Sequence, residues 1–525
     1  MPELSRNTQG ALEGARPVPA QALVARLSAF GHAGYLLAGM LLLVPISAEA
    51  KTLYVNGSTG NDSTSYAANG PSAPWRSIGR ALWGSTNRGA PNGAEAARAG
   101  DVVDVACGMY DTPGPNANGF TGIALSPVNN GTAGQPIRIQ SSTNQPCIQV
   151  RFTSGSGSVI GTHDKSYVQW SGFDLNETNT PWDVSHGHQS AQVWISGDEA
   201  GTTAVGNVVE NSRFQGTSTS ARDGDNYTTI RLHGTSGTTI RNVYVRNVGQ
   251  TDENSGCILW YFTKNITIEH NRFERCGSGI YMKGDSLPTH PGFYTIRFNR
   301  FVDNHIGIIA FTNANAAPAT PGLIHQNIFE RGQYGVKLNA FGDDRNPNDL
   351  KFLNNIFSGQ SSWCLEVRGD LIGNAGMVFQ NNICVGSGDA AIGSDGGTTA
   401  ASLQAARFLA NHNVYQNVSQ TRFSTVSLTE VSFSSWQSTY GQDAAAPAGL
   451  ITSSPLFADT DFHAAATSPA LNRGRAAYGV GGANGTPIHA GPYITGAEVI
   501  GPTSLGPITP PLPAPAAPTN VRVIR

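Results

Sequence analysis

The sequence predicts an all-β solenoid, a fold in which short strands and turns stack in successive coils. An asparagine followed two residues later by an aromatic or apolar residue recurs every 27 to 29 residues. The copies are Asn242-Val-Tyr244, Asn271-Arg-Phe273, Asn299-Arg-Phe301, Asn327-Ile-Phe329, Asn355-Ile-Phe357 and Asn382-Ile-Cys384. A Gly-Ile or Gly-Val pair begins 8 residues after three of these asparagines, at Gly279, Gly307 and Gly335. Two markers in phase at one period indicate a stacked repeat.

Each repeat contains two short alternating runs, such as residues 266–270 and 279–283, with Gly, Asn, Asp and Ser between them. These are strand patterns, and nothing in the repeat has helical spacing over ten residues. Such a unit cannot bury its own apolar face, so it must stack on its neighbours. We expect the recurring asparagines to form an internal ladder at one corner, in which each side-chain amide bonds to the coils above and below.

The composition is polar, uncharged and rich in turn-forming residues. Of 525 residues, 62 are Gly, only 13% are charged, and the formal net charge is −3. This composition is typical of extracellular β-proteins, since an average soluble domain has about 25% charged residues. No basic block occurs, so nucleic acid is not expected as a partner.

The N-terminus predicts an export signal. Arg16 and Arg26 precede an apolar run at residues 35–46, which is followed by an A-x-A pattern at residues 48–50. We expect cleavage near Ala50. The apolar run is too short for a membrane span, so the mature protein is expected to have none. The predicted location is therefore secreted, periplasmic or at the cell surface.

The six cysteines all follow the signal, and an even number in an exported chain permits disulfides. Cys257 occupies the position that Gly279 holds one coil later, and Cys276 lies three residues before Gly279. A bridge between these two cysteines is therefore expected. Cys107–Cys147 and Cys364–Cys384 are further candidate pairs, but the sequence alone leaves the connectivity open.

The segment after the signal predicts a strand, a polar loop, a short capping helix near Ile78–Trp83 and another strand. It contains the motifs Tyr54-Val, a Gly/Asp-rich loop, Pro74-x-x-x-Ile78, Ala99-Gly-Asp-x-Val103 and Gly108-x-Tyr110. With these motifs, the segment resembles the N-terminal signature of exported right-handed parallel β-helix proteins of the pectate-lyase type. The resemblance covers roughly residues 51–475. It implies a single-stranded right-handed parallel β-helix with an N-terminal cap and an irregular C-terminal segment.

The resemblance and the repeat together divide the chain into five segments. These are a signal peptide (1–50), the N-terminal cap and first coils (51–160), the β-helix coils (161–420), an irregular C-terminal segment (421–500) and a Pro-rich tail (501–525). The fold is less informative about activity, because one fold hosts many functions.

Alternation along the strands separates inward from outward side chains. If Ile280 and Met282 point inward, Tyr281 and Lys283 point outward. The same phase in every coil gives two outward columns. One column contains Arg231, Leu259, Tyr281, Ile309, Lys337 and Glu366; the other contains His233, Tyr261, Lys283, Phe311, Asn339 and Arg368. Aromatic faces suit sugar rings, and Lys or Arg suits the carboxylates of uronates.

These columns contain the residue types that β-elimination on a polyuronide requires. A base removes the proton next to the carboxylate, and a cation stabilises the developing charge. Lys283 is the first candidate for the base, because neighbouring cations or desolvation can lower a lysine pKa. Its expected partners are Arg231 or Arg368 for the carboxylate, and Tyr281, Tyr261 or His233 as proton donor.

Lys337 is the second candidate for the base. Gly335-Val-Lys337-Leu is similar to the Gly-aromatic-Lys-Leu strand that carries the base lysine in some pectate-lyase-type families. For each outward lysine, the alternative is a solvated surface residue. The expected substrate contacts are Tyr261, Asn339, Glu366 and Arg368.

Acidic residues before two neighbouring strands suggest a calcium site. Asp223 and Asp225 precede one strand, and Asp252 and Glu253 precede the next. Asp225 and Glu253 fall on the same corner of adjacent coils, where oxygen ligands suit Ca²⁺. However, calcium-dependent lyases of this fold carry an Asp-Asp-Gly-x-Asp run where this chain has Ser255-Gly-Cys-Ile258. Two exposed acidic turns are the alternative.

The sequence therefore favours an exported, monomeric polysaccharide lyase acting on an acidic glycan. A non-catalytic glycan-binding or structural surface solenoid is the alternative. A glycoside hydrolase is less favoured. The polygalacturonase-like hydrolases of this fold use Gly-His-Gly, whereas His186-Gly-His188 lacks the first Gly and precedes all the acidic pairs.

Overall fold

The computed structural model of the chain describes most of the region after the predicted signal. The described residues are 49–115, 122–181, 191–198, 200–218, 227–283, 294–310, 322–338, 350–366, 376–393, 408–418, 423–425, 429–503 and 505. Within them, almost all regular structure is β, and no helix is long and apolar enough to cross a membrane.

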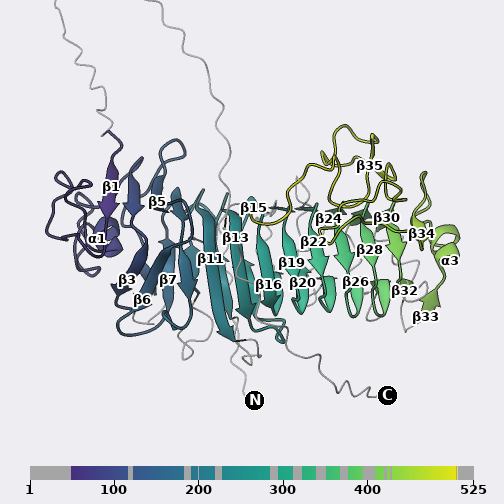
Figure 1. The fold of residues 1–525 in the computed structure, drawn as a ribbon, viewed down its shortest axis with the longest axis horizontal. Coiled ribbons are helices and arrows are strands. Elements are labelled where there is room, and N and C mark those ends of the chain that lie inside the picture. Colours follow the sequence, from purple (N-terminus) through teal and green to yellow (C-terminus); the bar gives the residue numbers. More distant parts are fainter. Residues whose placement is uncertain are drawn as a thin grey trace, which may run out of the picture. The chain divides into compact units, whose positions relative to one another are not determined.

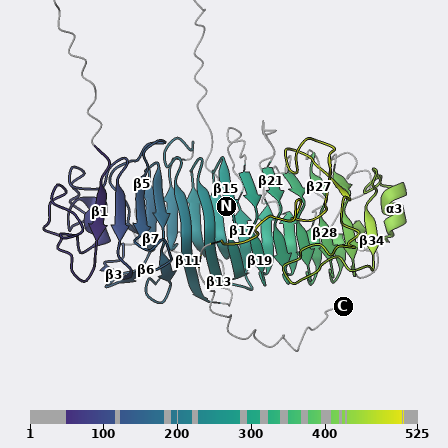
Figure 2. The ribbon, with the colours of Figure 1, turned by 45° about the horizontal axis from the view of Figure 1, so that its top comes forward.

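Two long parallel sheets make up the fold, and both run through successive coils (Figure 1, Figure 2). Among the described residues, the larger sheet has 20 strands and the smaller has 12. From Val168 onward, the described coils contribute two strands to the larger sheet, on either side of a corner, and one to the smaller sheet. Equivalent strands of successive coils pair in parallel, whereas the last pair of the smaller sheet, Phe423–Thr425 with Thr429–Val431, is antiparallel.

The first row of the larger sheet contains β1 (Thr52–Val55), β2 (Val102–Val105), β5 (Ile137–Ser141), β8 (Val168–Ser171), β11 (Val208–Ser218), β13 (Thr239–Val248), β15 (Ile266–Glu269), β18 (Tyr294–Arg297), β21 (Gly322–His325), β24 (Leu350–Leu353), β27 (Val378–Gln380) and β30 (Leu409–Asn411). Its second row contains β9 (Asp174–Asn176), β16 (Arg272–Cys276), β19 (Arg300–Val302), β22 (Ile328–Glu330), β25 (Ile356–Ser358), β28 (Ile383–Val385), β31 (Val414–Gln416) and β34 (Leu450–Thr452). The long strands β11 and β13 span both rows.

The smaller sheet contains β4 (Ile123–Leu125), β7 (Ser158–His163), β10 (Val193–Ser196), β12 (Thr228–His233), β14 (Gly256–Tyr261), β17 (Ser278–Met282), β20 (Ile306–Ala310), β23 (Tyr334–Leu338), β26 (Trp363–Glu366), β29 (Ala390–Gly393), β32 (Phe423–Thr425) and β33 (Thr429–Val431). The remaining elements are α1 (Ile78–Trp83), β3 (Gly108–Thr112), β6 (Ile148–Phe152), α3 (Phe433–Ser438), β35 (Gly474–Arg475) and β36 (Pro487–Ile488).

The predicted inward phase of the smaller sheet is confirmed. Ile258, Ile280, Ile308 and Val336 are in register from coil to coil and are completely buried. Met282 is buried in the same core. On the larger sheet, the aromatic position of the repeat forms a stack, in which the rings of Phe301, Phe329 and Phe357 lie 4.5 to 4.7 Å apart.

The asparagine ladder is also confirmed. From Asn271 to Asn413, each side-chain Nδ2 donates to the Oδ1 of the next rung, at distances between 2.9 and 3.3 Å. The same Oδ1 accepts the backbone N–H of the preceding rung, as in Asn299 to Asn327 at 3.0 Å. The last rung is Asp443, whose Oδ1 accepts from Asn413 Nδ2 at 3.0 Å.

Asn242 is not a rung, which corrects the expected first copy of the repeat. In β13, Tyr244 pairs with Arg272, so the rung position opposite Asn271 is held by Val243. Asn242 instead adopts a left-handed backbone with φ of 53° and accepts the backbone N–H of Thr503 at 2.7 Å. Its spacing of 29 residues to Asn271 is one longer than the next intervals, and the extra residue shifts it out of phase.

The predicted N-terminal helix is present over the expected residues. All six residues of α1 are buried, and the N-cap hydroxyl of Ser77 accepts from Arg80 N at 3.1 Å. Ile78 and Leu82 join the core that runs through the coils. That the segment containing α1 caps the end of the β-helix remains a prediction.

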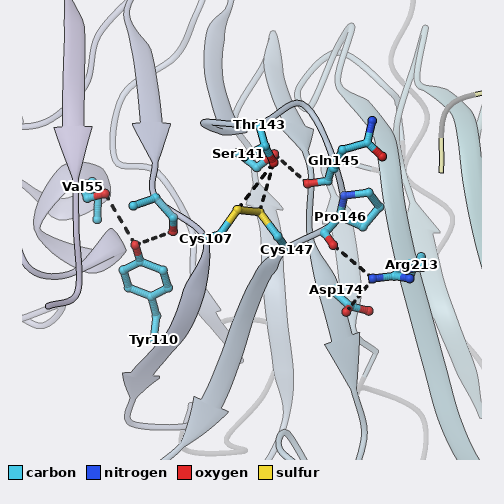
Figure 3. Close-up of a disulfide and its surroundings, with 11 residues drawn as sticks. Val55, Cys107, Tyr110, Ser141, Thr143, Gln145, Pro146, Cys147, Asp174 and Arg213 are labelled. Carbon is cyan, nitrogen blue, oxygen red and sulfur yellow. Dashed lines mark hydrogen bonds and ion pairs between the residues drawn. A yellow bond between two sulfur atoms is a disulfide. The ribbon is translucent and has the colours of Figure 1, made fainter. Parts of the chain in front are cut away.

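Three disulfides join the six cysteines in the pairs considered from the sequence. Cys257–Cys276 links β14 to β16, and Cys364–Cys384 links β26 to β28. Cys107–Cys147 joins the segments that lead into β3 and β6 (Figure 3).

After β34, the described chain is irregular apart from the short β35–β36 pair, and it returns along the coils (Figure 1, Figure 2). Asp461 pairs with Arg300 at 2.7 Å, and Gly501 N donates to Phe298 O at 2.8 Å.

We predict that Asn327→Ala lowers the free energy of unfolding by about 3 kcal/mol or more, because each buried polar group left without a partner costs about 1–3 kcal/mol. The substitution removes the acceptor of Asn299 N and the donor to Ile296 O. Chemical denaturation followed by circular dichroism measures the loss. Asn484→Ala, at an exposed turn, is the control and should leave the midpoint unchanged. Equal midpoints for the two variants would show that the ladder does not stabilise the fold.

Candidate functional site

The strand register of the smaller sheet aligns the first predicted column. Trp194, Arg231, Leu259, Tyr281, Ile309, Lys337 and Glu366 are direct neighbours from coil to coil. In the second column, His233 pairs with Tyr261, and Lys283 follows β17 one coil later. Phe311, Asn339 and Arg368 lie outside the described residues. Trp194 was missed from the sequence, although the alternating run Val193-Trp-Ile-Ser196 could have indicated it.

The middle of this face is closed rather than open. Leu259, Tyr281 and Ile309 are buried in a small apolar cluster of their own, separate from the main core. Tyr261 and Tyr334 pack against this cluster. The side chains therefore point away from the core as predicted, but a continuous open groove does not follow from that direction. The half-buried members of the second column, His233, Tyr261 and Lys283, are more accessible.

Arg231 carries a buried charge for which no described residue provides a counter-ion. The residue is 7% exposed, and its guanidinium carbon lies 5.4 Å from the centre of the Tyr261 ring and 6.0 Å from that of Trp194. Nε and Nη1 find no hydrogen-bond acceptor among the described residues. Burial lowers the pKa of Arg231. Because an unpaired buried charge is costly, this site favours an anionic ligand.

Lys283 lies close to Arg231 and to two tyrosine rings. Its Nζ is 4.7 Å from the centre of the Tyr281 ring and 5.7 Å from that of Tyr261. Burial and then the positive charge of Arg231 lower the pKa of Lys283 to about 8, against the opposing charge of Asp252. A fraction of the amine is therefore neutral near physiological pH, which is the form that accepts a proton.

The two tyrosines beside Lys283 remain protonated. Burial raises the pKa of Tyr261, although the charge of Arg231 opposes the shift. Burial and the charge of Glu253 raise the pKa of Tyr281. Both hydroxyls can therefore donate a proton. Tyr261 is the more accessible donor, because Tyr281 is only 1% exposed. The His233 ring lies 6.1 Å from that of Tyr261.

Lys337 has a different environment on the same face. Its Nζ forms an ion pair with Glu253 Oε2 at 2.9 Å. Burial lowers the pKa of Lys337, but the bond to Glu253 and the charge of Glu366 outweigh burial and raise it overall. Glu366 itself is buried, beside Lys337 in register. Lys337 is therefore held in its charged form, which is unfavourable for a base.

The predicted calcium ligands have other partners where they are described. Glu253 is paired with Lys337, and the Asp252 carboxylate accepts from Asn254 N at 3.0 Å and Ser255 Oγ at 2.8 Å. Asp223 and Asp225 lie outside the described residues. Within the described part of the chain, no three His, Cys, Asp or Glu side chains are grouped to hold a metal. Calcium binding remains a prediction, and we assign it no role in the chemistry.

The comparison with protein families agrees with this architecture. Residues 183–405 match the family model described as a right handed beta helix region. The chain is therefore a right-handed parallel β-helix repeat protein, as the sequence predicted. No curated protein matches the sequence at a significant level.

Solved β-helix structures are similar at low identity. Pectate lyase Pel9A is 14% identical with a TM-score of 0.49, covering 85% of this chain and 96% of its own. A mannuronic acid specific polysaccharide family 6 lyase from human gut microbiota is 12% identical with a TM-score of 0.41, covering 73% and 78%. The mannuronan C-5 epimerase AlgE4 A-module of Azotobacter vinelandii is 13% identical with a TM-score of 0.43, covering 69% and 87%. At these values, no activity follows from the similarity.

We predict that Lys283 and Lys337 react differently with an amine-specific reagent as the pH changes. Modification of Lys283 should be half-maximal near pH 8, because that is where its amine loses a proton. Lys337 should require a pH above the ordinary lysine range, since the ion pair retains its proton. Peptide mass spectrometry after brief labelling measures both sites in one sample. Superimposable profiles for the two lysines would contradict the environments described above.

Proposed function

We propose that this protein is a polysaccharide lyase that cleaves a uronate-containing glycan by β-elimination. The observation that carries the proposal is the neighbourhood of Lys283. A lysine with a lowered pKa lies beside a tyrosine that remains protonated and a buried arginine that has no counter-ion among the described residues. These three groups match the three requirements of the reaction: a base, a partner for the carboxylate, and a proton donor.

In the proposed reaction, the carboxylate of the uronate enters beside the Tyr261 ring and pairs with the Arg231 guanidinium. Lys283 Nζ removes the proton on C5, next to that carboxylate. The electron pair forms the C4=C5 double bond as the bond from C4 to the glycosidic oxygen breaks. The Tyr261 hydroxyl donates its proton to the departing oxygen. The pairing with Arg231 is favourable because it neutralises a buried charge that no described residue compensates.

A non-catalytic glycan-binding or structural solenoid is the second candidate. The burial of Leu259, Tyr281 and Ile309 favours it, because these residues leave no open groove along the middle of the face. In that case, Arg231 and Tyr261 would hold an acidic sugar without turnover.

We also propose that the protein is exported and acts as a monomer on an acidic polysaccharide. The three disulfides support an oxidising compartment outside the cytoplasm. The predicted signal sequence, cleaved near Ala50, supports the same location.

We predict that Lys283→Ala abolishes turnover while leaving the thermal unfolding midpoint close to that of the unchanged protein. The assay follows the ultraviolet absorbance of unsaturated uronate on pectate, alginate and glycosaminoglycans, with Ca²⁺ or with a chelator. Lys264→Ala is the matched control, because the side chain of this lysine donates to Ala200 O in an exposed contact outside the candidate site. Full activity of Lys283→Ala would exclude it as the base. Saturable binding without product on any substrate would favour the non-catalytic alternative.

We further predict that kcat/KM rises with pH and levels off above about pH 8. The neutral form of Lys283 accepts the proton, and its fraction increases as the pH passes its pKa of about 8. Well below that pKa, the rate should fall tenfold per pH unit. Initial rates on one soluble polyuronide across the pH range measure this profile. A rate that is independent of pH between 6 and 9 would contradict the assignment of Lys283 as base.

A further inference from the structure

A polar pocket lies on the larger sheet, whereas Lys283 follows a strand of the smaller sheet. The volume of the pocket is about 210 Å³, and the residues that line it belong to β6, β9, β11, β13, the loop after β9 and the C-terminal segment. The polar side chains that line it are Gln149, Asp174, Asn176, Asn179, Arg213, Gln215, Tyr244 and Arg246. Leu505 contributes to the wall, and the segment before it is fixed to the coils through Gly501 and Thr503.

Arg213 is the neutralised cation of this pocket. Its Nη2 donates to Asp174 Oδ2 at 3.0 Å and to Pro146 O at 3.1 Å. Figure 3 shows Arg213 between these two acceptors, with the Cys107–Cys147 disulfide next to Pro146. Asp174 and Arg213 are also direct neighbours in strand register. The charge of Arg213 is therefore compensated, and its side chain is held in place.

Arg246 is the second cation of the pocket, and no described carboxylate forms an ion pair with it. Its Nε and Nη2 both donate to Gln215 Oε1, at 3.1 and 2.6 Å, and its guanidinium carbon lies 5.7 Å from the centre of the Tyr244 ring. Among the described residues, no carboxylate pairs with it. Its register neighbour Glu274 is already shared, since Arg272 pairs with it at 2.8 Å and the Tyr244 hydroxyl donates to it at 3.0 Å.

The pocket thus combines one surplus positive charge with four side-chain amides. Amides both donate and accept hydrogen bonds, which matches sugar hydroxyls, and a guanidinium matches a carboxylate. The volume is below the roughly 300–1,000 Å³ of pockets for drug-sized ligands, and this suits a single sugar residue. We propose that this pocket binds one uronate residue of an acidic glycan. In this proposal, the carboxylate of the uronate pairs with the Arg246 guanidinium, and the sugar hydroxyls form hydrogen bonds with the surrounding side-chain amides.

This second binding site holds the glycan on a different sheet from Lys283. It requires no chemistry, so it stands whether or not the protein is a lyase. Because glycans are long, one chain can contact both faces, or two chains can be bound at once.

The test uses the full mature chain carrying Lys283→Ala, so that no substrate is consumed. Trigalacturonate, trimannuronate and triguluronate are titrated into the protein by calorimetry at low ionic strength. Arg246→Gln should weaken binding of at least one of these probes tenfold or more, and Arg246→Lys should restore part of it. Arg241→Gln is the matched control on the same strand, since Arg241 is exposed and pairs with Glu210 at 2.6 Å. This control should bind like the parent.

The methyl ester of the tightest-binding probe tests the ligand class, and it should bind at least tenfold more weakly than the acid. Equal affinities of Arg246→Gln and Arg241→Gln would overturn the pocket, and so would an absence of binding by every probe. Equal binding of the ester would overturn the carboxylate recognition. Arg246-dependent binding without any unsaturated product from the unchanged protein would reject the lyase proposal alone. Product formation with binding that is insensitive to Arg246 would reject the pocket alone.

Discussion

The asparagine ladder fixes the register of the coils, and the arrangement of the outward side chains follows from that register. At the same corner of successive coils, a buried side-chain amide forms hydrogen bonds with the rung on each side and with the backbone. These bonds oppose any shift in the register of one coil relative to the next. In a parallel sheet, a slip of one residue would turn every side chain to the opposite face. The ladder ends at Asp443, where a buried carboxylate also accepts from the Tyr415 hydroxyl and Trp436 Nε1, at 2.8 and 3.2 Å.

The register of the coils determines which charged side chains become neighbours on the smaller sheet. Two lysines on the same face of the smaller sheet have pKa values shifted in opposite directions. Lys283 lies against Arg231 and aromatic rings, whereas Lys337 is paired with Glu253. The residue type is the same, and only the neighbours brought by stacking differ. In the chemistry we propose, this contrast selects Lys283 as the base and leaves Lys337 a charged structural residue.

The presence or absence of a paired carboxylate separates the structural arginines from those that are candidates for ligand binding. Many outward arginines, such as Arg213, Arg297 and Arg331, pair with a carboxylate in their own or an adjacent coil. Arg231 on the smaller sheet and Arg246 on the larger sheet have no such partner among the described residues. Both lie beside aromatic rings and other polar groups. Two separate faces thus favour an anionic ligand in a chain of low overall charge.

The repeat, the strand phase and the asparagine ladder from Asn271 to Asn382 were predictable from local spacing, whereas the sequence offered the three cysteine pairs as candidates and left their connectivity open. It misplaced Asn242, where one additional residue breaks the phase. The ion pair of Lys337 with Glu253, 84 residues away, and the burial of Tyr281 become visible only in the folded chain. Burial and pairing depend on the neighbours that stacking assembles from distant coils, and these set the pKa values of the candidate site.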